Sequence, residues 1–242
     1  MRRALIVGGA NGIGLTIATL MAQDSKFEKI YILDKASMDS KYDCDKFSHH
    51  TFDLRSDDYS YFDRFSDIDT LMITAGFGRL AHFADVDEQH IIDSFSVNTT
   101  AVIRIIHHFY KRLLGSEDFY CGVMGSIAGF MSSPLFAIYG ATKAALKIFI
   151  ESVNVELEMA GTSNRILNVS PGSIKGTAFY NGATDLSLTT ALASEIISHL
   201  EQKDDLFIPQ YDEIFKHVLE RYHNDFRAEG RHSYEYKMKS NR

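Results

Sequence analysis

Residues 4–14, ALIVGGANGIG, decide the fold class of this chain. Four apolar residues lead into glycines, and residues 13–22 continue with apolar side chains at helical spacing. A buried strand, a glycine-rich turn and a helix in this order are typical of the phosphate-binding end of a dinucleotide-binding fold. Glycines let the backbone approach a pyrophosphate, and the helix amino terminus offers unpaired N–H groups. We expect this turn to bind a dinucleotide through Gly8, Asn11, Gly12, Ile13 and Gly14.

Short runs rich in Val, Ile and Leu alternate with longer stretches of helical period. This alternation predicts an α/β fold, a Rossmann-type doubly wound parallel sheet of about seven strands with helices on both faces. Because the strand runs are apolar along their length, burial on both faces is expected. Strands are predicted at 4–8, 30–34, 51–54, 70–74, 119–124, 165–170 and 206–208, and helices at 13–22, 57–65, 88–114, 139–160 and 188–202.

Two acidic positions extend the predicted dinucleotide site. Asp34 closes the second predicted strand, twenty positions after Gly14, where a carboxylate can accept hydrogen bonds from the adenosine ribose hydroxyls. The same charge would repel a 2′-phosphate, so NAD is favoured over NADP as the cofactor. The third predicted strand ends in Asp53 and Leu54, which we expect at the edge of the adenine ring.

Composition excludes several classes of protein. The net charge is −7, which does not suggest a nucleic-acid surface. The first apolar run is too short for a signal peptide or a membrane helix, and no other stretch reaches spanning length. The two cysteines, with no CxxC spacing, suit a reducing cytoplasm, and Cys121 is expected to be a buried inert thiol. The histidines show no metal-ligand spacing, so no metal is predicted.

A tyrosine and a lysine mark a candidate catalytic end. Tyr139 and Lys143 stand four positions apart at the start of a predicted helix, hence on one face. A free phenol titrates near pH 10, and a nearby cation favours phenolate and lowers that pKa. Ser126 ends the fifth predicted strand, at the sheet edge where α/β proteins bind ligands.

Taken together, these residues resemble the short-chain dehydrogenase/reductase family in its shorter single-domain branch. The resemblance covers roughly residues 4–177. It includes the glycine turn, Asp34, the Asp53-Leu54 pair, Ala75-Gly76 after the fourth strand, Asn98, Ser126, Tyr139, Lys143 and Pro171-Gly172.

The resemblance implies a role for each matching residue. Tyr139 would be the general acid/base, and Lys143 would lower its pKa and hydrogen-bond the nicotinamide ribose. Ser126 would hold the substrate oxygen, and Asn98 would anchor a water in a proton relay. The remaining cofactor contacts would come from Ala75, Gly76, Pro171, Gly172 and Ile174.

The chain also departs from the family pattern. Residues 73–76 read Ile-Thr-Ala-Gly where the family has Asn-Asn-Ala-Gly, so Thr74 is expected to replace a bracing amide only partly. Gly176 displaces Thr177 by one position, which leaves its contact with the carboxamide open. Residues 1–242 are expected to form one domain, with 209–242 as a helical extension. Its apolar stripe is expected to pack on the parent domain or a neighbouring subunit, and a substrate cap is the alternative.

The expected activity is reversible NAD(H)-dependent oxidation of a secondary alcohol to a ketone. The alternatives are a nucleotide-sugar epimerase or dehydratase and a non-catalytic dinucleotide-binding protein. The expected pocket residues weakly favour a polyol or sugar substrate over a steroid-like ring; they are Phe130, Met131, Ser132, Phe136, Phe179, Tyr180, Asn181 and Asp185.

Assembly is expected as well. The helices at 88–114 and 139–160 carry apolar residues on several faces, which predicts a homodimer or homotetramer. We expect a charge at Ile103 or Ile150 to disrupt it.

Overall fold

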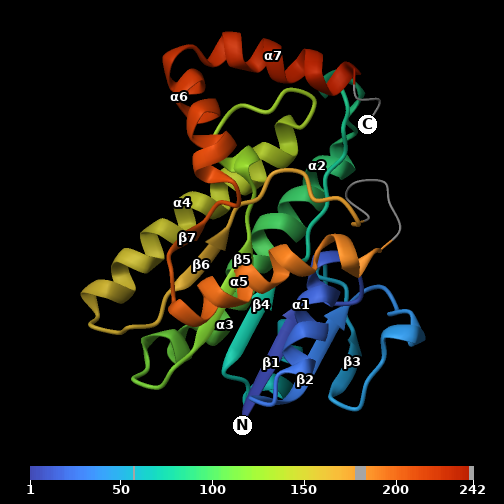
Figure 1. The fold of residues 1–242 in the computed structure, drawn as a ribbon, viewed down its shortest axis with the longest axis vertical. Coiled ribbons are helices and arrows are strands. Elements are labelled where there is room, and N and C mark those ends of the chain that lie inside the picture. Colours follow the sequence, from blue (N-terminus) through green and yellow to red (C-terminus); the bar gives the residue numbers. More distant parts are fainter. Residues whose placement is uncertain (57, 178–183, 240–242) are drawn as a thin grey trace.

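The computed structural model describes residues 1–56, 58–177 and 184–239. Its centre is a sheet of seven parallel strands in the order β3-β2-β1-β4-β5-β6-β7 (Figure 1). The order changes direction between β1 and β4, and the crevice outside the strand ends at such a point is where open α/β sheets bind ligands. The predicted doubly wound parallel fold is confirmed.

The described elements have the following bounds. The strands are β1 (Arg2–Val7), β2 (Phe27–Asp34), β3 (Phe47–Thr51), β4 (Thr70–Ile73), β5 (Tyr120–Met124), β6 (Ile166–Val169) and β7 (Leu206–Phe207). The α-helices are α1 (Gly12–Gln23), α2 (Glu88–Phe95), α3 (Ala101–Leu114), α4 (Ala137–Met159), α5 (Thr190–Gln202), α6 (Lys216–Asn224) and α7 (Phe226–Lys239). Shorter helical turns include η2 (Tyr59–Phe65), η4 (Ser96–Thr100), η5 (Ile127–Gly129), η7 (Leu186–Leu188) and η8 (Tyr211–Phe215).

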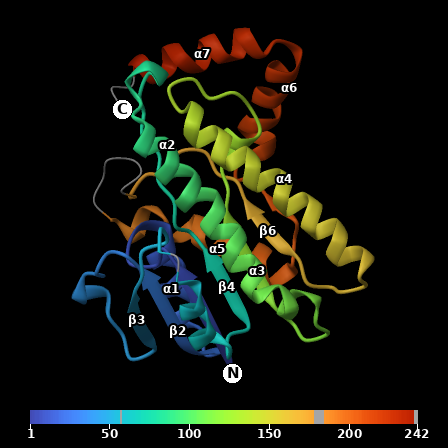
Figure 2. The same ribbon diagram turned by 180° about the vertical axis from the view of Figure 1, so that it is seen from behind.

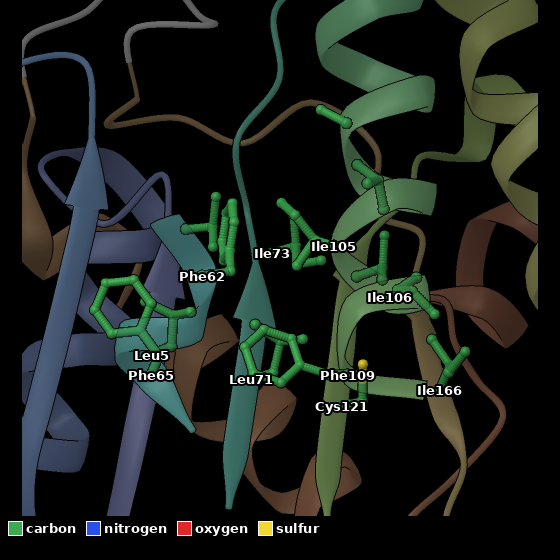
Figure 3. Packing of buried hydrophobic residues seen from close by; sticks show 14 of the residues in the cluster. Leu5, Phe62, Phe65, Leu71, Ile73, Ile105, Ile106, Phe109, Cys121 and Ile166 are labelled. Atoms are coloured by element: carbon green, nitrogen blue, oxygen red, sulfur yellow. The ribbon is translucent and has the colours of Figure 1, made fainter. Parts of the chain in front are cut away.

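The sheet is covered on both faces, which explains its apolar central strands. Alternate residues of β1 point to opposite sides, and both sets are buried. Ala4 and Ile6 pack with α1 and α5 on the face seen in Figure 1. Leu5 belongs to the core on the other face, which α3, α4 and η2 line. Figure 2 shows that face, and Figure 3 shows Leu5 near Phe62 and Phe65 of η2.

The third strand was predicted at the wrong place. It runs over Phe47–Thr51, not 51–54, and its side chains are half-buried or exposed. β3 is the edge strand and pairs only with β2 among the described strands, so its sequence needs no apolar run. The helix predicted at 57–65 is the 3₁₀ turn η2, and residue 57 lies outside the described residues.

The long helix predicted at 88–114 is interrupted. η4 is a π-helical turn between α2 and α3. One turn of π-helix holds an extra residue and shifts the register of everything before it. The predicted apolar stripe therefore breaks: Asn98 and Val102 are buried, whereas Phe95 is 37% exposed.

The apolar residues of α4 divide between the core and the surface. Ile150, Val153 and Leu157 are buried in the core of the same chain, whereas Ile148 is 60% and Val155 59% exposed. Our expectation that a charge at Ile150 tests assembly was therefore wrong, because Ile150 is 1% exposed and a charge there would disrupt the fold. Ile103 is partly buried against the same core, so a charge there would affect folding as well as assembly.

Two helices follow the last strand. α6 and α7 lie beyond the carboxyl ends of β5 and β6, and α7 ends beside the segment that leads into α2 (Figures 1 and 2). Within the predicted apolar stripe, Phe215, Val218, Leu219 and Tyr222 are half-buried, while Ile214 and Phe226 are exposed. The stripe thus packs partly on the parent chain.

Candidate active site

The glycine turn connects β1 to α1 and demands glycine at two points. A methyl group on Gly14 would lie 2.3 Å from the carbonyl oxygen of Gly8. One on Gly8, whose φ is +87°, would lie 2.5 Å from the nitrogen of Ala75. Side chains at either position would push the turn away from the strand ends. The close approach therefore packs the turn tightly against the strand ends at the start of α1, and a glycine-rich cradle of this kind accepts a phosphate group in dinucleotide-binding folds.

The amino terminus of α1 faces a hydroxyl group. Asn11 precedes the helix in extended conformation and makes no side-chain capping bond. The backbone N–H of Gly12 donates to Thr184 Oγ1 at 3.2 Å, and Ile13 behind it is buried. An N–H that is paired with an oxygen acceptor can exchange it for a phosphate oxygen. Thr184 was not predicted from sequence, because no spacing rule connects residues 172 positions apart.

Thr74 holds the turn against β4. Its Oγ1 lies 3.1 Å from the carbonyl oxygen of Val7 and 3.0 Å from that of Gly8, within reach to donate to either. The backbone N–H groups of Thr74 and Ala75 both donate to Val7 as well. The hydroxyl therefore supplies a brace at the position where we expected only a partial replacement.

The acidic positions lie at neighbouring strand ends. Asp34 Oδ2 accepts the backbone N–H of Ala10 at 3.1 Å, which joins the end of β2 to the glycine turn. Asp53 follows β3 by two residues, and Arg55 holds its carboxylate at 2.6 Å and lowers its pKa to about 2. Leu54 beside it is buried. Both acids therefore lie at the carboxyl ends of neighbouring strands, β2 and β3.

Ser126 and Tyr139 meet at the other side of the crevice. Ser126 is the residue before η5, and its side chain accepts the backbone N–H of Ala128 at 3.1 Å. Tyr139 lies in the first turn of α4 and hydrogen-bonds to Ser126. Burial raises the pKa of Tyr139 to about 12, and the bond to Ser126 opposes that rise. The expected lowering of this pKa by Lys143 is not found, because the exclusion of water outweighs other contributions.

Lys143 is buried one turn further along α4. Its Nζ donates to the carbonyl oxygen of Met124 at 2.7 Å and lies 5.7 Å from the centre of the Tyr139 ring. Burial lowers the pKa of Lys143 to about 8, so the amine can hold or release a proton near neutrality. A buried titratable pair of this kind is common at catalytic sites.

Asn98 completes this group from the π-helical turn. Its Nδ2 donates to the carbonyl oxygen of Phe77 at 2.7 Å, and its Oδ1 accepts the Phe77 N–H at 2.9 Å. A methyl group on Gly76 would lie 3.3 Å from Asn98 Oδ1 and 3.5 Å from Lys143 Nζ. One point in space is thus close to both polar atoms, which is the arrangement a bridging water requires.

The Pro171–Gly172 segment follows β6 and lies beside Ser126. The carbonyl oxygen of Pro171 accepts the N–H of Ile127 at 3.0 Å. Thr177 donates to the carbonyl oxygen of Ile174 at 2.9 Å, and its methyl group lies near the cradle of Gly12. The expected pocket residues Phe179, Tyr180 and Asn181 lie outside the described residues.

Within the described residues, no three His, Cys, Asp or Glu side chains form a group that could hold a metal ion. No helix there is both long and apolar enough to cross a membrane. Cys121 is buried as predicted, and burial raises the pKa of its thiol to about 12.

Comparisons with known proteins identify the family. The family model described as short chain dehydrogenase matches residues 2–185. An uncharacterized short-chain type dehydrogenase/reductase of Sinorhizobium fredii is 27% identical over 175 residues, which cover 71% of this chain and 69% of that protein. Matches span 37% to 70% of the lengths of the curated relatives.

Solved structures share the fold. A short-chain dehydrogenase from Streptomyces avermitilis has a TM-score of 0.77 at 18% identity, with 99% of this chain and 100% of that chain covered. One from Sphingobium yanoikuyae, in complex with NADPH, has a TM-score of 0.73 at 20% identity and covers 93% and 96%. Because the family model matches residues 2–185, most of the chain, this chain belongs to the short-chain dehydrogenase family of nucleotide-binding oxidoreductases.

Proposed function

We propose that this protein interconverts a secondary alcohol and a ketone with NAD(H), and that Tyr139 is the general acid/base. The main observation in support is the buried group at the start of α4, in which Tyr139 hydrogen-bonds to Ser126 and Lys143 lies one turn away. A bound nicotinamide dinucleotide would supply or accept the hydride. The chain's own residues then have to hold the substrate oxygen and move one proton.

Ser126 and Tyr139 would bind the substrate oxygen together. In reduction the phenol donates its proton to the developing alkoxide, and in oxidation the phenolate takes the proton from the alcohol. The pKa of about 12 favours the protonated form, which suits the donor in ketone reduction. Oxidation needs additional positive charge near the phenol.

Lys143 and Asn98 would return the proton to Tyr139. The space over Gly76 lies within 3.5 Å of both Lys143 Nζ and Asn98 Oδ1, so a water there can connect them. Lys143 would also donate to a ribose hydroxyl. With a pKa of about 8 it can pass a proton at neutral pH.

The residues at the other end fit a dinucleotide. The cradle at Gly8, Gly12 and Gly14 would hold the pyrophosphate, and Asp34 would accept the ribose hydroxyls. We propose NAD over NADP because the Asp34 carboxylate repels a 2′-phosphate. The Sphingobium relative binds NADPH, so cofactor preference has to be measured on this chain.

We also propose a homodimer or homotetramer. The outer face of α4 exposes Ile148, Val155 and Met159 by 60%, 59% and 82%, and these residues stand seven and four positions apart on one side of the helix. An exposed apolar stripe of this kind gains free energy when a second copy covers it. A cytoplasmic location stays a proposal, supported by two unpaired thiols.

The Tyr139→Phe variant tests the proposed function. A panel of secondary alcohols, polyols and ketones, followed by NADH absorbance, first identifies a substrate. We expect Tyr139→Phe to lower turnover about 10²- to 10⁴-fold with little change in dinucleotide affinity, because the phenol moves the proton only. Tyr42→Phe, on the distant turn η1 (Ser40–Tyr42), serves as the control.

The outcomes separate three functions. If Tyr139→Phe retains more than about a tenth of the rate, Tyr139 is not the acid/base. A wild-type protein that binds NAD but turns over neither the panel nor a nucleotide sugar is a non-catalytic binding protein. Turnover of a nucleotide sugar without net NADH formation would identify an epimerase or dehydratase.

A further inference from the structure

The chain after β7 spans the catalytic end of the molecule. We propose that Tyr211–Lys239, here named the roof segment, closes the substrate site, and that Phe215 limits the size of the substrate group next to Gly172. The inference rests on the proposed function. It adds a wall that lies beyond the region matched by the family model, which ends at residue 185.

The first contact is at the end of β6. A methyl group on Gly172 would lie 2.8 Å from Phe215 Cζ, so the phenylalanine ring edge touches the glycine backbone. Gly172 follows Pro171, which bonds to the residue after Ser126. The ring of Phe215 is therefore placed next to the strand ends that carry the catalytic serine.

The second contact is beside the catalytic tyrosine. Lys237 Nζ lies 5.5 Å from the centre of the Phe136 ring, and the ring of Tyr139 lies 5.7 Å from that same centre. The same ammonium donates to Ser133 Oγ at 2.7 Å and to the carbonyl oxygen of Pro134 at 2.8 Å. The roof segment thus reaches the immediate surroundings of Tyr139 as well as those of Gly172.

Internal contacts make the roof segment one body. Glu229 is 9% exposed and accepts from Arg221 Nε at 2.7 Å and Nη2 at 3.2 Å, which locks α7 to α6. Gly230 is buried where α7 packs on the loop below, since a methyl group there would be in van der Waals contact with Ser132 Oγ at 3.5 Å. Tyr234 contacts the ring of His82 near the far end. A substrate therefore binds under a roof fixed at both ends, visible above the sheet in Figures 1 and 2.

The chemistry of the wall favours an apolar substituent. Phe215 lies against Gly172 and Phe136 lies beside Tyr139, and neither aromatic ring offers a side-chain hydrogen bond. A hydroxyl group buried against such a ring loses water without gaining a partner, which costs free energy. The roof thus selects a ketone or alcohol with a compact hydrocarbon group on the Phe215 side, rather than the polyol or sugar that the sequence weakly favoured.

Two substitutions test the contact without any substrate. Gly172→Ala should lower the melting temperature, because its methyl group meets the Phe215 ring. Phe215→Ala in the same chain should recover most of that loss. Phe226→Ala is the matched control, since Phe226 lies in the same segment with 49% exposure and should recover none. Equal losses in the single and double variants would overturn the placement of the roof.

Substrate profiles then test the specificity. We expect Phe215→Ala, with Phe215→Leu as a milder second variant, to raise kcat/KM for long 2-alkanols relative to 2-propanol by about tenfold or more. NAD affinity is measured in parallel, because Phe215 touches Gly172, which the family resemblance assigns to the cofactor. An unaltered chain-length profile in a folded variant overturns the role of Phe215, and a wild-type preference for polyols overturns the apolar wall. If the wild type turns over nothing while the Gly172–Phe215 coupling is present, the proposed function fails and the roof remains.

Discussion

Replacing Lys143 by Met removes the buried amine and should change how stability depends on pH. Burial lowers the pKa of Lys143 from 10.5 to about 8 in the folded, ligand-free protein. Between these two values the unfolded chain binds more protons than the folded one, so the stability of the wild type rises with pH. Below pH 8 both states are protonated and the full cost of burying the charge is present.

The magnitude follows from the shift. One pKa unit corresponds to about 1.4 kcal/mol, so linkage predicts that wild-type stability relative to Lys143→Met rises by about 2 to 3 kcal/mol between pH 7 and pH 10. The hydrogen bond to Met124 that the variant loses shifts the difference in unfolding free energy by a constant amount. It leaves the pH dependence of that difference unchanged. Effects of other titrating groups, including Tyr139, are shared by both proteins and cancel.

Urea unfolding at pH 7, 8, 9 and 10 measures this difference directly. The free energy of unfolding of Lys143→Met, relative to that of the wild type, should fall steadily above pH 8. Parallel stability curves for the two proteins over that range would show that the Lys143 pKa is not lowered. The account of a proton-exchanging lysine would then be wrong.

Three further outcomes are expected. Asp34→Ala should weaken the preference for NAD over NADP, since a carboxylate near a 2′-phosphate costs about 1–4 kcal/mol, or about ten- to a thousandfold in affinity; equal wild-type efficiency with both cofactors contradicts this. Thr74→Val should weaken NAD binding about fivefold at unchanged kcat, the value of one neutral hydrogen bond, while Thr74→Ser binds normally in the same titration. Ile148→Glu should release monomers of 27.3 kDa in sedimentation at micromolar concentration, and a wild type that is already monomeric rules out the proposed assembly.

The sequence was most informative where local chemistry alone sets the structure. The Gly8–Gly14 turn was predictable because tight backbone approach leaves glycine as the sole choice at two positions. The doubly wound parallel sheet followed from the alternation of short apolar runs and helical periods. The edge strand β3 was not predictable, since partly exposed residues such as Ser48 and His50 carry no apolar pattern.

The electrostatics and long-range contacts of the site could not be read from spacing. The four-residue interval placed Lys143 near Tyr139, but the degree of burial that raises one pKa and lowers the other depends on the whole fold. The Thr184 hydroxyl at Gly12 and the Phe215 ring at Gly172 join residues that are distant in sequence. Such contacts depend on tertiary packing, which cannot be derived from residue spacing in a single sequence.

The π-helical turn Ser96–Thr100 shows what orienting one amide costs. An unbroken α-helix advances about 100° per residue, so removing the extra residue would rotate Asn98 by about that angle relative to α3. Phe95, now 37% exposed, would turn with it, and the amide would leave Phe77 and the space over Gly76. The chain instead keeps a phenylalanine partly in water and a less regular hydrogen-bond ladder. Apolar burial has been given up at this point of the fold for the direction of a single polar side chain.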